Sequence, residues 1–471
     1  MTHKPPQDQD IIIVGATGDL AKRKLLPALY NLHVSGLLPK NGRIVGCARS
    51  EVSEDDFREL AAAAVKEFSR TGLDKAAWKT FEPRLTYVAT ADGYDAVHKL
   101  CLLPERLVYL AIPPSAFGAT IDGIAASGLV EGTRLVIEKP FGHDLQSSRE
   151  LADKIHEHFD ERQVLRIDHY LGKETVQNIL VFRFGNSVFE KVWSRDMIEH
   201  VQFTVAESIG IEGRGAFYEE TGAFRDILQN HAFQVLSLLT MEAPATFGAE
   251  AVRDEKHKVF ESMRPLEPAD VVRGQYTSGA VGGERVPGYL EEEGVHPESQ
   301  VETFAALRMW IDNWRWAGVP FYLRTGKRMT RQVTEATIVF RQAPVHFFRP
   351  MGVQDLAPNT LTITIQPEES ITFKFMAKVP GPDVEIEPVT MSFSYDTSFK
   401  DKPAEEAYET LLNDAMENDP TLFARADSVE LAWEVVQPVL DAMPPVQPYF
   451  AGTWGPRAAD ELILPHKWHL R

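Results

Sequence analysis

A glycine turn near the amino terminus constrains the fold of this chain more than any other feature of its sequence. The aliphatic run Ile11 to Val14 has the composition of a buried parallel strand. Gly15-Ala16-Thr17-Gly18-Asp19-Leu20-Ala21 follows it directly, and a helical pattern extends from Leu20 to about Asn31. A strand, a glycine turn and a helix in this order predict the first unit of a doubly wound parallel sheet.

The remainder of the first third repeats the alternation of short apolar runs and amphipathic segments. Helical patterns cover Ser53 to Phe68, with Ser53 as the N-cap, and Ser147 to Phe159. The further strand candidates are Arg43 to Cys47, Leu85 to Val88, Leu107 to Ala111, Leu135 to Ile137 and Val164 to Ile167. This alternation predicts an α/β domain over residues 1–175, with a Rossmann-like, doubly wound parallel sheet.

The pattern changes after Glu174. Helical patterns cover Glu174 to Phe184 and Ala216 to Met241, and Val201 to Ala206 alternates like a half-buried strand. Gly282 to Pro297 has the composition of an exposed loop. Later strand-like runs are Phe321 to Arg324, Ala336 to Phe340, Leu361 to Gln366, Ile371 to Met376 and Met391 to Tyr395. Helical patterns follow at Ala404 to Met416 and Ser428 to Met443. We therefore predict an α+β domain over residues 176–471, with a large antiparallel sheet and helices.

Charge and composition exclude several classes of function. The formal net charge of −19 disfavours binding to nucleic acid and to anionic membranes. No apolar stretch reaches the roughly 18 residues that a membrane span needs, and the first ten residues resemble no secretion signal. Two cysteines are too few for a disulfide framework, and no cluster has the spacing of metal ligands. We expect a cytoplasmic protein without a metal.

The glycine turn has the features of a dinucleotide site. Gly15 permits the tight turn, Gly18 lets the backbone approach a pyrophosphate, and the following helix N-terminus attracts a phosphate. The candidate cofactor-binding residues of the turn are Gly15, Thr17, Gly18, Asp19, Leu20 and Lys22. The alternative is a purely structural turn, because two glycines alone are weak evidence.

Arg49, at the end of the second strand, bears on which dinucleotide binds. An NAD site usually carries Asp or Glu near this position, whereas an arginine suits the 2′-phosphate of NADP by charge and by bidentate geometry. We therefore expect NADP, the alternative being that Arg49 is a solvated surface residue.

Two further segments contain residue types that suit catalysis. Residues 166–174, Arg-Ile-Asp-His-Tyr-Leu-Gly-Lys-Glu, follow the last predicted parallel strand, where ligands of open α/β sheets bind. Residues 225–231, Arg-Asp-Ile-Leu-Gln-Asn-His, lie within a predicted helix. His231 shares a helical face with apolar residues, and taken alone such a residue is more often a hydrogen-bonded core histidine than a catalyst.

Together these segments resemble the glucose-6-phosphate dehydrogenase family. Residues 166–174 match the family signature without a departure, and Gly18 to Lys22 match its cofactor turn. The other matching segments are residues 138–142, 213–215, 225–231, 312–316, 326–327 and 449–462. The resemblance therefore extends over nearly the whole chain and implies a Rossmann-like domain followed by a sheet domain through which the family forms dimers or dimers of dimers.

The resemblance also implies roles for individual residues. His231 would be the general base that takes the proton from the C1 hydroxyl of glucose 6-phosphate, and Asp168 would orient it. The implied substrate-binding residues are His169, Tyr170 and Lys173 for the phosphate, Glu207, Asp226 and Lys327 for the sugar hydroxyls, and Lys139 between substrate and cofactor. The implied reaction is oxidation to 6-phosphogluconolactone with NADP, the entry step of the oxidative pentose phosphate pathway.

Two positions depart from the family pattern, and two rival interpretations stay open. Gln332 occupies a position where the family usually has Lys or Arg near the phosphate, with Arg331 beside it, and Phe117 stands where many members have Tyr. We expect residues 327–332 to form a loop from which Arg331 reaches the phosphate. The first rival is another sugar oxidoreductase, but such enzymes lack the nine-residue sequence that this chain has at 166–174. The second is a non-catalytic protein that binds NADP, and the joint retention of Asp168, Lys173 and His231 argues against it.

Overall fold

The computed structural model describes residues 5–344, 347–349, 356–400 and 405–469, which form two compact units. Unit 1 comprises residues up to Glu174 together with Pro244–His257 and Glu405–Glu430, and unit 2 comprises the remainder. The principal division lies one residue from the expected one at 175/176. Two later segments that we had assigned to the second domain nevertheless belong to unit 1.

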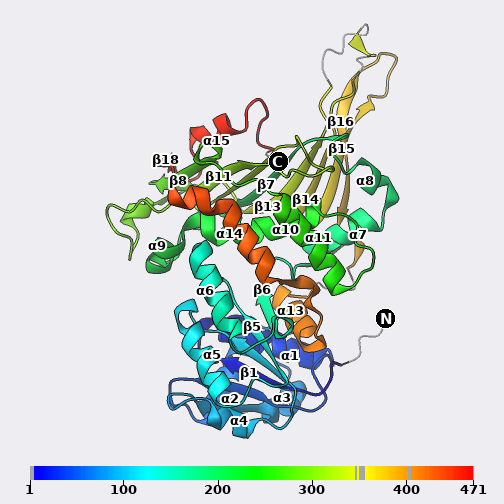
Figure 1. Ribbon diagram of the computed structural model, residues 1–471. Coiled ribbons are helices and arrows are strands. Elements are labelled where there is room, and N and C mark those ends of the chain that lie inside the picture. Colours follow the sequence, from blue (N-terminus) through cyan, green and yellow to red (C-terminus); the bar gives the residue numbers. More distant parts are fainter. Residues whose placement is uncertain (1–4, 345–346, 350–355, 401–404, 470–471) are drawn as a thin grey trace. The chain divides into compact units, whose positions relative to one another are not determined.

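Unit 1 is built on a seven-stranded sheet in the order β17-β6-β5-β4-β1-β2-β3 (Figure 1). The strands are β1 (Asp10–Val14), β2 (Ile44–Ala48), β3 (Leu85–Ala89), β4 (Arg106–Leu110), β5 (Thr133–Ile137), β6 (Val164–Ile167) and β17 (Phe423–Ala424). Six strands are parallel, and β17 pairs antiparallel with β6. The predicted Rossmann-like sheet is confirmed, with every strand candidate of the first third in place.

The first helical segment of unit 1 follows the glycine turn, and a serine caps the next helix. The helix after the glycine turn starts as a π-helix, η1 (Ala21–Leu25), and continues as α1 (Leu26–Val34). Ser53 caps α2, since its side chain accepts a hydrogen bond from the Asp56 amide. Helix α2 spans Glu54–Phe68. The other α-helices of residues 50–160 are α3 (Lys75–Phe81), α4 (Asp95–Leu100), α5 (Phe117–Ala126) and α6 (Leu145–His156).

A segment from late in the sequence completes unit 1. Helix α13 (Ala407–Glu417) packs against α1, and the short strand β17 extends the sheet beyond β6 (Figure 1). Glu409 anchors α13 to the rest of the unit. Its carboxylate is 1% exposed and accepts two hydrogen bonds from Arg70 at 2.7 Å and one from Asn31 at 2.9 Å. Residues Glu405–Glu430 therefore form part of the unit that carries the glycine turn.

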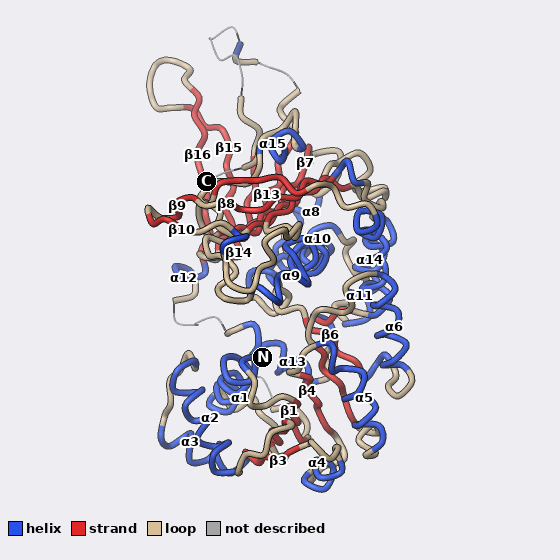
Figure 2. Tube along the Cα trace, turned by 90° about the vertical axis from the view of Figure 1, so that its left-hand side faces the viewer, coloured by secondary structure: helices blue, strands red, loops and turns tan. Residues whose placement is uncertain are grey.

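Unit 2 is built on a nine-stranded sheet in the order β16-β15-β14-β13-β7-β12-β11-β8-β18 (Figure 2). Its strands are β7 (Ile198–Ala206), β8 (Val271–Thr277), β11 (Phe304–Met309), β12 (Phe321–Gly326), β13 (Val333–Phe340), β14 (Thr360–Gln366), β15 (Ser370–Lys378), β16 (Ile386–Ser394) and β18 (Val446–Phe450). The predicted large sheet is confirmed. It is mixed, because β7 pairs parallel with β12 and β8 with β18.

The helix predicted over Ala216 to Met241 is broken into three segments: α9 (Gly215–Ala223), the π-helix η5 (Phe224–Ala232) and α10 (Phe233–Thr240). Gly222 causes the first break, since its φ of +66° lies in the left-handed region that glycine tolerates. A β-carbon there would lie 2.4 Å from Glu302 Oε1. The same Glu302 oxygen accepts a hydrogen bond from the Phe224 amide at 3.1 Å and so holds the start of η5.

The other helices of unit 2 include α7 (Glu174–Phe184), which was predicted, and α8 (Ser187–Val192). Helices α11 (Ala249–Ser262) and α14 (Ala426–Asp441) have residues in both units, and α15 (Arg457–Leu462) packs on β8 and β11. The predicted loop Gly282 to Pro297 contains one strand of a small hairpin, β9 (Gly279–Val281) with β10 (Glu284–Val286). Among the described helices, none combines the length and the apolar character needed to cross a bilayer.

Candidate active site

The glycine turn after β1 has the geometry of a phosphate cradle. Gly15 has a φ of +88°, and a β-carbon there would lie 2.3 Å from the carbonyl oxygen of Ala111. The amides of Gly15 and Ala16 donate to the Cys47 carbonyl, which ties the turn to the end of β2. Only glycine fits this position, so the backbone can approach a ligand closely, as a pyrophosphate requires.

Charged side chains surround the turn. The Asp19 carboxylate accepts from Arg23 at 2.9 Å, one helical turn further on, and Lys22 is partly exposed. Arg49, the residue after β2, is exposed and makes no hydrogen bond or ion pair with any residue in the described part of the chain. A guanidinium at a strand end without a carboxylate partner is suited to an anionic group such as a phosphate.

Lys139 and Glu138 follow the carboxyl end of β5. The peptide bond from Lys139 to Pro140 is cis, and Lys139 is partly exposed. The Glu138 carboxylate accepts hydrogen bonds from Tyr109 at 2.5 Å and from Tyr408, on α13, at 3.0 Å. Burial raises the pKa of Glu138 even though both hydrogen bonds and the Lys139 charge act in the opposite direction.

The segment predicted from residues 166–174 forms a compact turn after β6. Asp168 is 3% exposed, and its Oδ1 accepts from the Tyr170 amide at 2.9 Å. The Lys173 ammonium lies 4.4 Å from the centre of the Tyr170 ring, and the His169 ring lies 5.1 Å from it. Backbone hydrogen bonds thus bring the predicted phosphate-binding residues His169, Tyr170 and Lys173 together on one turn.

In unit 2, η5 places Asp226 and His231. His231 is 1% exposed. A π-helix closes its hydrogen bonds between residues five apart, so Asp226 and His231, which are five apart, lie about one turn from each other. Irregular helices of this kind are frequent at functional sites, which favours a functional role for His231 over that of an ordinary core histidine.

Two other predicted site residues of unit 2 form an ion pair. Lys327, 4% exposed, pairs with the Glu207 carboxylate. Backbone hydrogen bonds from Glu207 to Gly326 at 2.9 Å and from Lys327 to Thr303 at 2.9 Å set the two residues at the ends of β7 and β12. The Tyr449 hydroxyl donates to the Lys327 carbonyl at 2.6 Å. These contacts fix a cation and a carboxylate that could both address sugar hydroxyls.

Residues 327–332 form a loop before β13, as expected. Arg331 and Gln332 are both exposed, and the Arg331 guanidinium lies 5.9 Å from the centre of the Trp454 ring. The predicted contact of Arg331 with a phosphate remains a prediction.

Sequence reasoning missed several residues beside the predicted ones. The Tyr408 ring lies beside that of His169, with ring centres 6.4 Å apart and an interplanar angle of 11°. Lys256, on α11, is 3% exposed with Asp168 as the nearby anion. Burial lowers the pKa of Lys256 to about 8. Tyr408 lies in no motif and only the fold of α13 brings it to the turn, so no local signal could have identified it.

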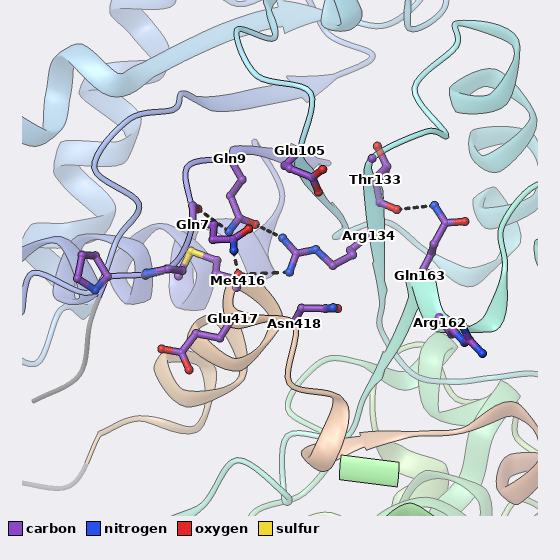
Figure 3. A pocket seen from close by; sticks show the side chains of 13 residues that line it. Gln7, Gln9, Glu105, Thr133, Arg134, Arg162, Gln163, Met416, Glu417 and Asn418 are labelled. Carbon is purple, nitrogen blue, oxygen red and sulfur yellow. Dashed lines mark hydrogen bonds between the residues drawn. The ribbon is translucent and has the colours of Figure 1, made fainter. Parts of the chain in front are cut away.

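A cavity of about 700 Å³ lies in unit 1 but at the opposite edge of the sheet (Figure 3). Its lining residues Gln9, Glu105, Thr133 and Gln163 stand at the amino ends of β1, β4, β5 and β6, whereas the glycine turn and residues 166–174 follow carboxyl ends. Figure 3 shows Arg134 donating to the backbone of Met416 and to Gln9. The guanidinium thus satisfies carbonyls at the C-terminal end of α13, and we interpret this network as structural.

Comparison with protein families covers both units. Residues 12–178 match the family profile described as glucose-6-phosphate dehydrogenase, NAD binding domain. Residues 180–469 match the profile described as glucose-6-phosphate dehydrogenase, C-terminal domain.

Individual proteins give the same result. The chain is 44% identical to a glucose-6-phosphate 1-dehydrogenase 2 of Mycobacterium tuberculosis, over 96% of this chain and 92% of that protein. It is 42% identical to the glucose-6-phosphate 1-dehydrogenase of Dickeya dadantii, over 96% of each chain. A solved glucose-6-phosphate dehydrogenase in complex with glucose 6-phosphate superposes with a TM-score of 0.89 at 36% identity, over 100% of each chain.

Proposed function

Because the chain belongs to the glucose-6-phosphate dehydrogenase family, we propose that it oxidises glucose 6-phosphate at C1 to 6-phosphogluconolactone, the entry step of the oxidative pentose phosphate pathway. Enzymes of this family are oxidoreductases that use NADP, and this chain has the family's dinucleotide-binding domain. The match of both units to the family, over residues 12–178 and 180–469, is the observation that carries the proposal.

His231 is the proposed general base. Its imidazole accepts the proton of the C1 hydroxyl, while bound NADP supplies the acceptor for the hydride that leaves C1. Asp168 hydrogen-bonds the imidazole, selects its tautomer and stabilises the imidazolium. The burial of both residues supports these roles, because a buried carboxylate and a buried imidazole are held in fixed orientations.

The proposed substrate contacts divide between sugar and phosphate. His169, Tyr170 and Lys173 donate to the 6-phosphate, and their clustering on one turn supports this role. Glu207, Asp226 and Lys327 bind the sugar hydroxyls, and the Lys327–Glu207 pair supports that role. Lys139 lies between substrate and cofactor in this proposal.

The proposed cofactor site uses the glycine turn and Arg49. Gly15 allows the close approach, and the backbone after Ala16 together with the helix N-terminus receives the pyrophosphate, with Thr17, Gly18, Asp19, Leu20 and Lys22 around it. The exposed Arg49, without a partner among the described residues, receives the 2′-phosphate and selects NADP over NAD.

We further propose a homodimer or homotetramer that acts in the cytoplasm. Val389 and Met391 on β16 are 40% and 62% exposed, which supports association through the sheet of unit 2. Both cysteines are free, as expected in a reducing compartment. Light scattering on the purified protein measures the oligomer size.

The proposed function is tested by following absorbance of the reduced nicotinamide after adding glucose 6-phosphate with either NADP or NAD. We expect turnover that requires glucose 6-phosphate and is faster with NADP at subsaturating cofactor. Cofactor binding without turnover would instead support a non-catalytic protein that senses NADP. Turnover with other sugars but not with glucose 6-phosphate would support a different sugar oxidoreductase.

A further inference from the structure

Tyr408 lies beside one residue that the proposed mechanism uses, His169, and beside the neighbour of another, Lys139. Its hydroxyl donates to Glu138 Oε1 at 3.0 Å, and Glu138 immediately precedes Lys139. Its ring lies nearly parallel to that of His169, one of the proposed phosphate ligands, with ring centres 6.4 Å apart and an angle of 11° between the planes. One side chain therefore lies against both the neighbour of Lys139, which is proposed to lie between substrate and cofactor, and a residue of the turn formed by residues 166–174, called the phosphate turn below.

Rigid contacts along α13 hold Tyr408 in this place. The next residue, Glu409, is buried and forms a bidentate pair with Arg70. At the other end of the helix, Arg134 donates to the Ala415 carbonyl at 2.9 Å (Figure 3 shows this guanidinium). A helix anchored at both ends can present a phenol with little rotational freedom.

The phosphate turn is shaped to receive α13. A β-carbon on Gly172 would lie 2.5 Å from the Ala407 carbonyl oxygen and 2.9 Å from Leu411 Cγ. Glycine at this position of residues 166–174 is thus explained by the approach of the helix that carries Tyr408. The turn and the helix are one packed assembly within unit 1.

Tyr109 provides an internal comparison. Tyr109 lies on β4 and is fully buried, and its hydroxyl donates to the same Glu138 oxygen at 2.5 Å. Two phenols on one oxygen fix the carboxylate from two sides, and each hydrogen bond to a charged acceptor contributes more than a neutral one.

We propose that Tyr408 is a positioning residue, which aligns Glu138, and through it Lys139, by its hydroxyl and aligns His169 by its ring. The inference rests on the proposed function. It assigns the late segment Glu405–Glu430 a part in organising the substrate end of unit 1. The two functions of the side chain are separable, because Tyr408→Phe removes the hydroxyl alone and Tyr408→Leu removes both hydroxyl and aromatic ring.

Steady-state kinetics of the full-length enzyme test this division. For Tyr408→Phe we expect kcat to fall about 3- to 10-fold, with the KM for glucose 6-phosphate within about twofold of wild type. For Tyr408→Leu we expect a similar fall in kcat and, in addition, a rise of about 5- to 10-fold in the KM for glucose 6-phosphate. Tyr30→Phe is the matched control, since Tyr30 is a fully buried tyrosine of the same unit whose hydroxyl hydrogen-bonds the Asp74 backbone. It should leave both constants within about twofold of wild type.

A double-mutant cycle tests the shared carboxylate. If Tyr408 and Tyr109 act through Glu138, the kcat losses of Tyr109→Phe and Tyr408→Phe will not multiply in the double variant. Wild-type constants in both Tyr408 variants would overturn the proposal, and so would fully independent losses in the cycle. Failure of the proposed function would instead show as absence of turnover in the wild-type protein. In that case, isothermal titration with glucose 6-phosphate compares the affinities of wild type and Tyr408→Leu. Equal affinities would overturn the role of the ring. If Tyr408→Leu does not fold, Tyr408→Phe and the cycle still decide the role of the hydroxyl.

Discussion

Gly172 and Ala407 are so close that a β-carbon on the glycine would lie 2.5 Å from the alanine carbonyl oxygen. The contact joins the phosphate turn to a helix that follows it by more than 230 residues in the sequence. The position tolerates no side chain, since the nearest atom is backbone and cannot rotate away.

Gly172→Ala should therefore destabilise unit 1 by about 1–3 kcal/mol, the usual cost of overpacking, and raise the KM for glucose 6-phosphate. Gly118→Ala is the matched control, because Gly118 lies in α5 and a β-carbon there meets no atom closer than 3.9 Å. The control should be neutral or slightly stabilising. Urea denaturation compares the two, and equal stabilities would show that α13 can yield.

Arg49→Ala should shift cofactor preference from NADP toward NAD. Loss of a charged hydrogen bond to the 2′-phosphate should weaken NADP binding by roughly 1.5–3 kcal/mol and leave NAD, which lacks that phosphate, almost unchanged. The ratio of kcat/KM for the two cofactors measures the shift. Equal losses for both cofactors would show that Arg49 has a structural role.

Lys173→Ala should raise the KM for glucose 6-phosphate steeply, whereas the KM for plain glucose should hardly change, because only the first carries the phosphate. Arg331→Ala should do the same more weakly, since the Arg331 guanidinium is exposed beside Trp454 and can move to a ligand. Kinetics with both sugars measure the two effects. If Arg331→Ala leaves both constants unchanged, the enzyme binds the phosphate without a cation from residues 331–332.

Acid should destabilise unit 2 through His200, on β7. The side chain is 4% exposed, and burial together with the nearby His466 lowers its pKa to about 3. Its Nε2 faces the Gln202 amide nitrogen at 3.0 Å, and that nitrogen also donates to the Lys467 carbonyl, so neutral His200 accepts there. Because the unfolded histidine takes up a proton near pH 6.5 and the folded one does not until about pH 3, stability is lost as the pH falls through this window.

Between pH 6.5 and 5 the expected loss from this residue is about 2 kcal/mol. The comparison is between wild type and His200→Gln, whose amide oxygen can replace the Nε2 acceptor, by urea denaturation at several pH values. Glu199, with its carboxylate 3.7 Å from His200 Nδ1, is retained in both proteins. Parallel stability curves for the two proteins would contradict the assignment.

The sequence predicted those parts of the fold that depend on local patterns. The strands of unit 1 are short, mostly apolar runs, and Gly15 marks a turn that no other residue can make, so both were predictable. The break at Gly222 was not, because it depends on the carboxylate of Glu302, 80 residues later. Strands β8, β11 and β18 were missed because their sequences show little regular alternation of apolar and polar residues.

The residues of the candidate site also fall into two groups: those that local motifs predicted and those that only the tertiary structure brings to the site. Residues 166–174 and 225–231 were found as uninterrupted motifs, and the loop at Arg331 was predicted from its turn residues. Tyr408 and Lys256 were missed, since each reaches the carboxyl edge of unit 1 only because its helix docks there. Contacts that tertiary structure alone creates leave no local signal in a single sequence.

The most direct test of the proposed function is the turnover number of His231→Asn with glucose 6-phosphate and NADP, measured together with the affinity for glucose 6-phosphate. If His231 is the general base, kcat should fall by about 10²- to 10⁴-fold, while the dissociation constant of glucose 6-phosphate, measured by isothermal titration, stays close to that of wild type. A kcat near the wild-type value in a folded variant that binds substrate would contradict the assignment. His231 would then be a buried core histidine without a catalytic role.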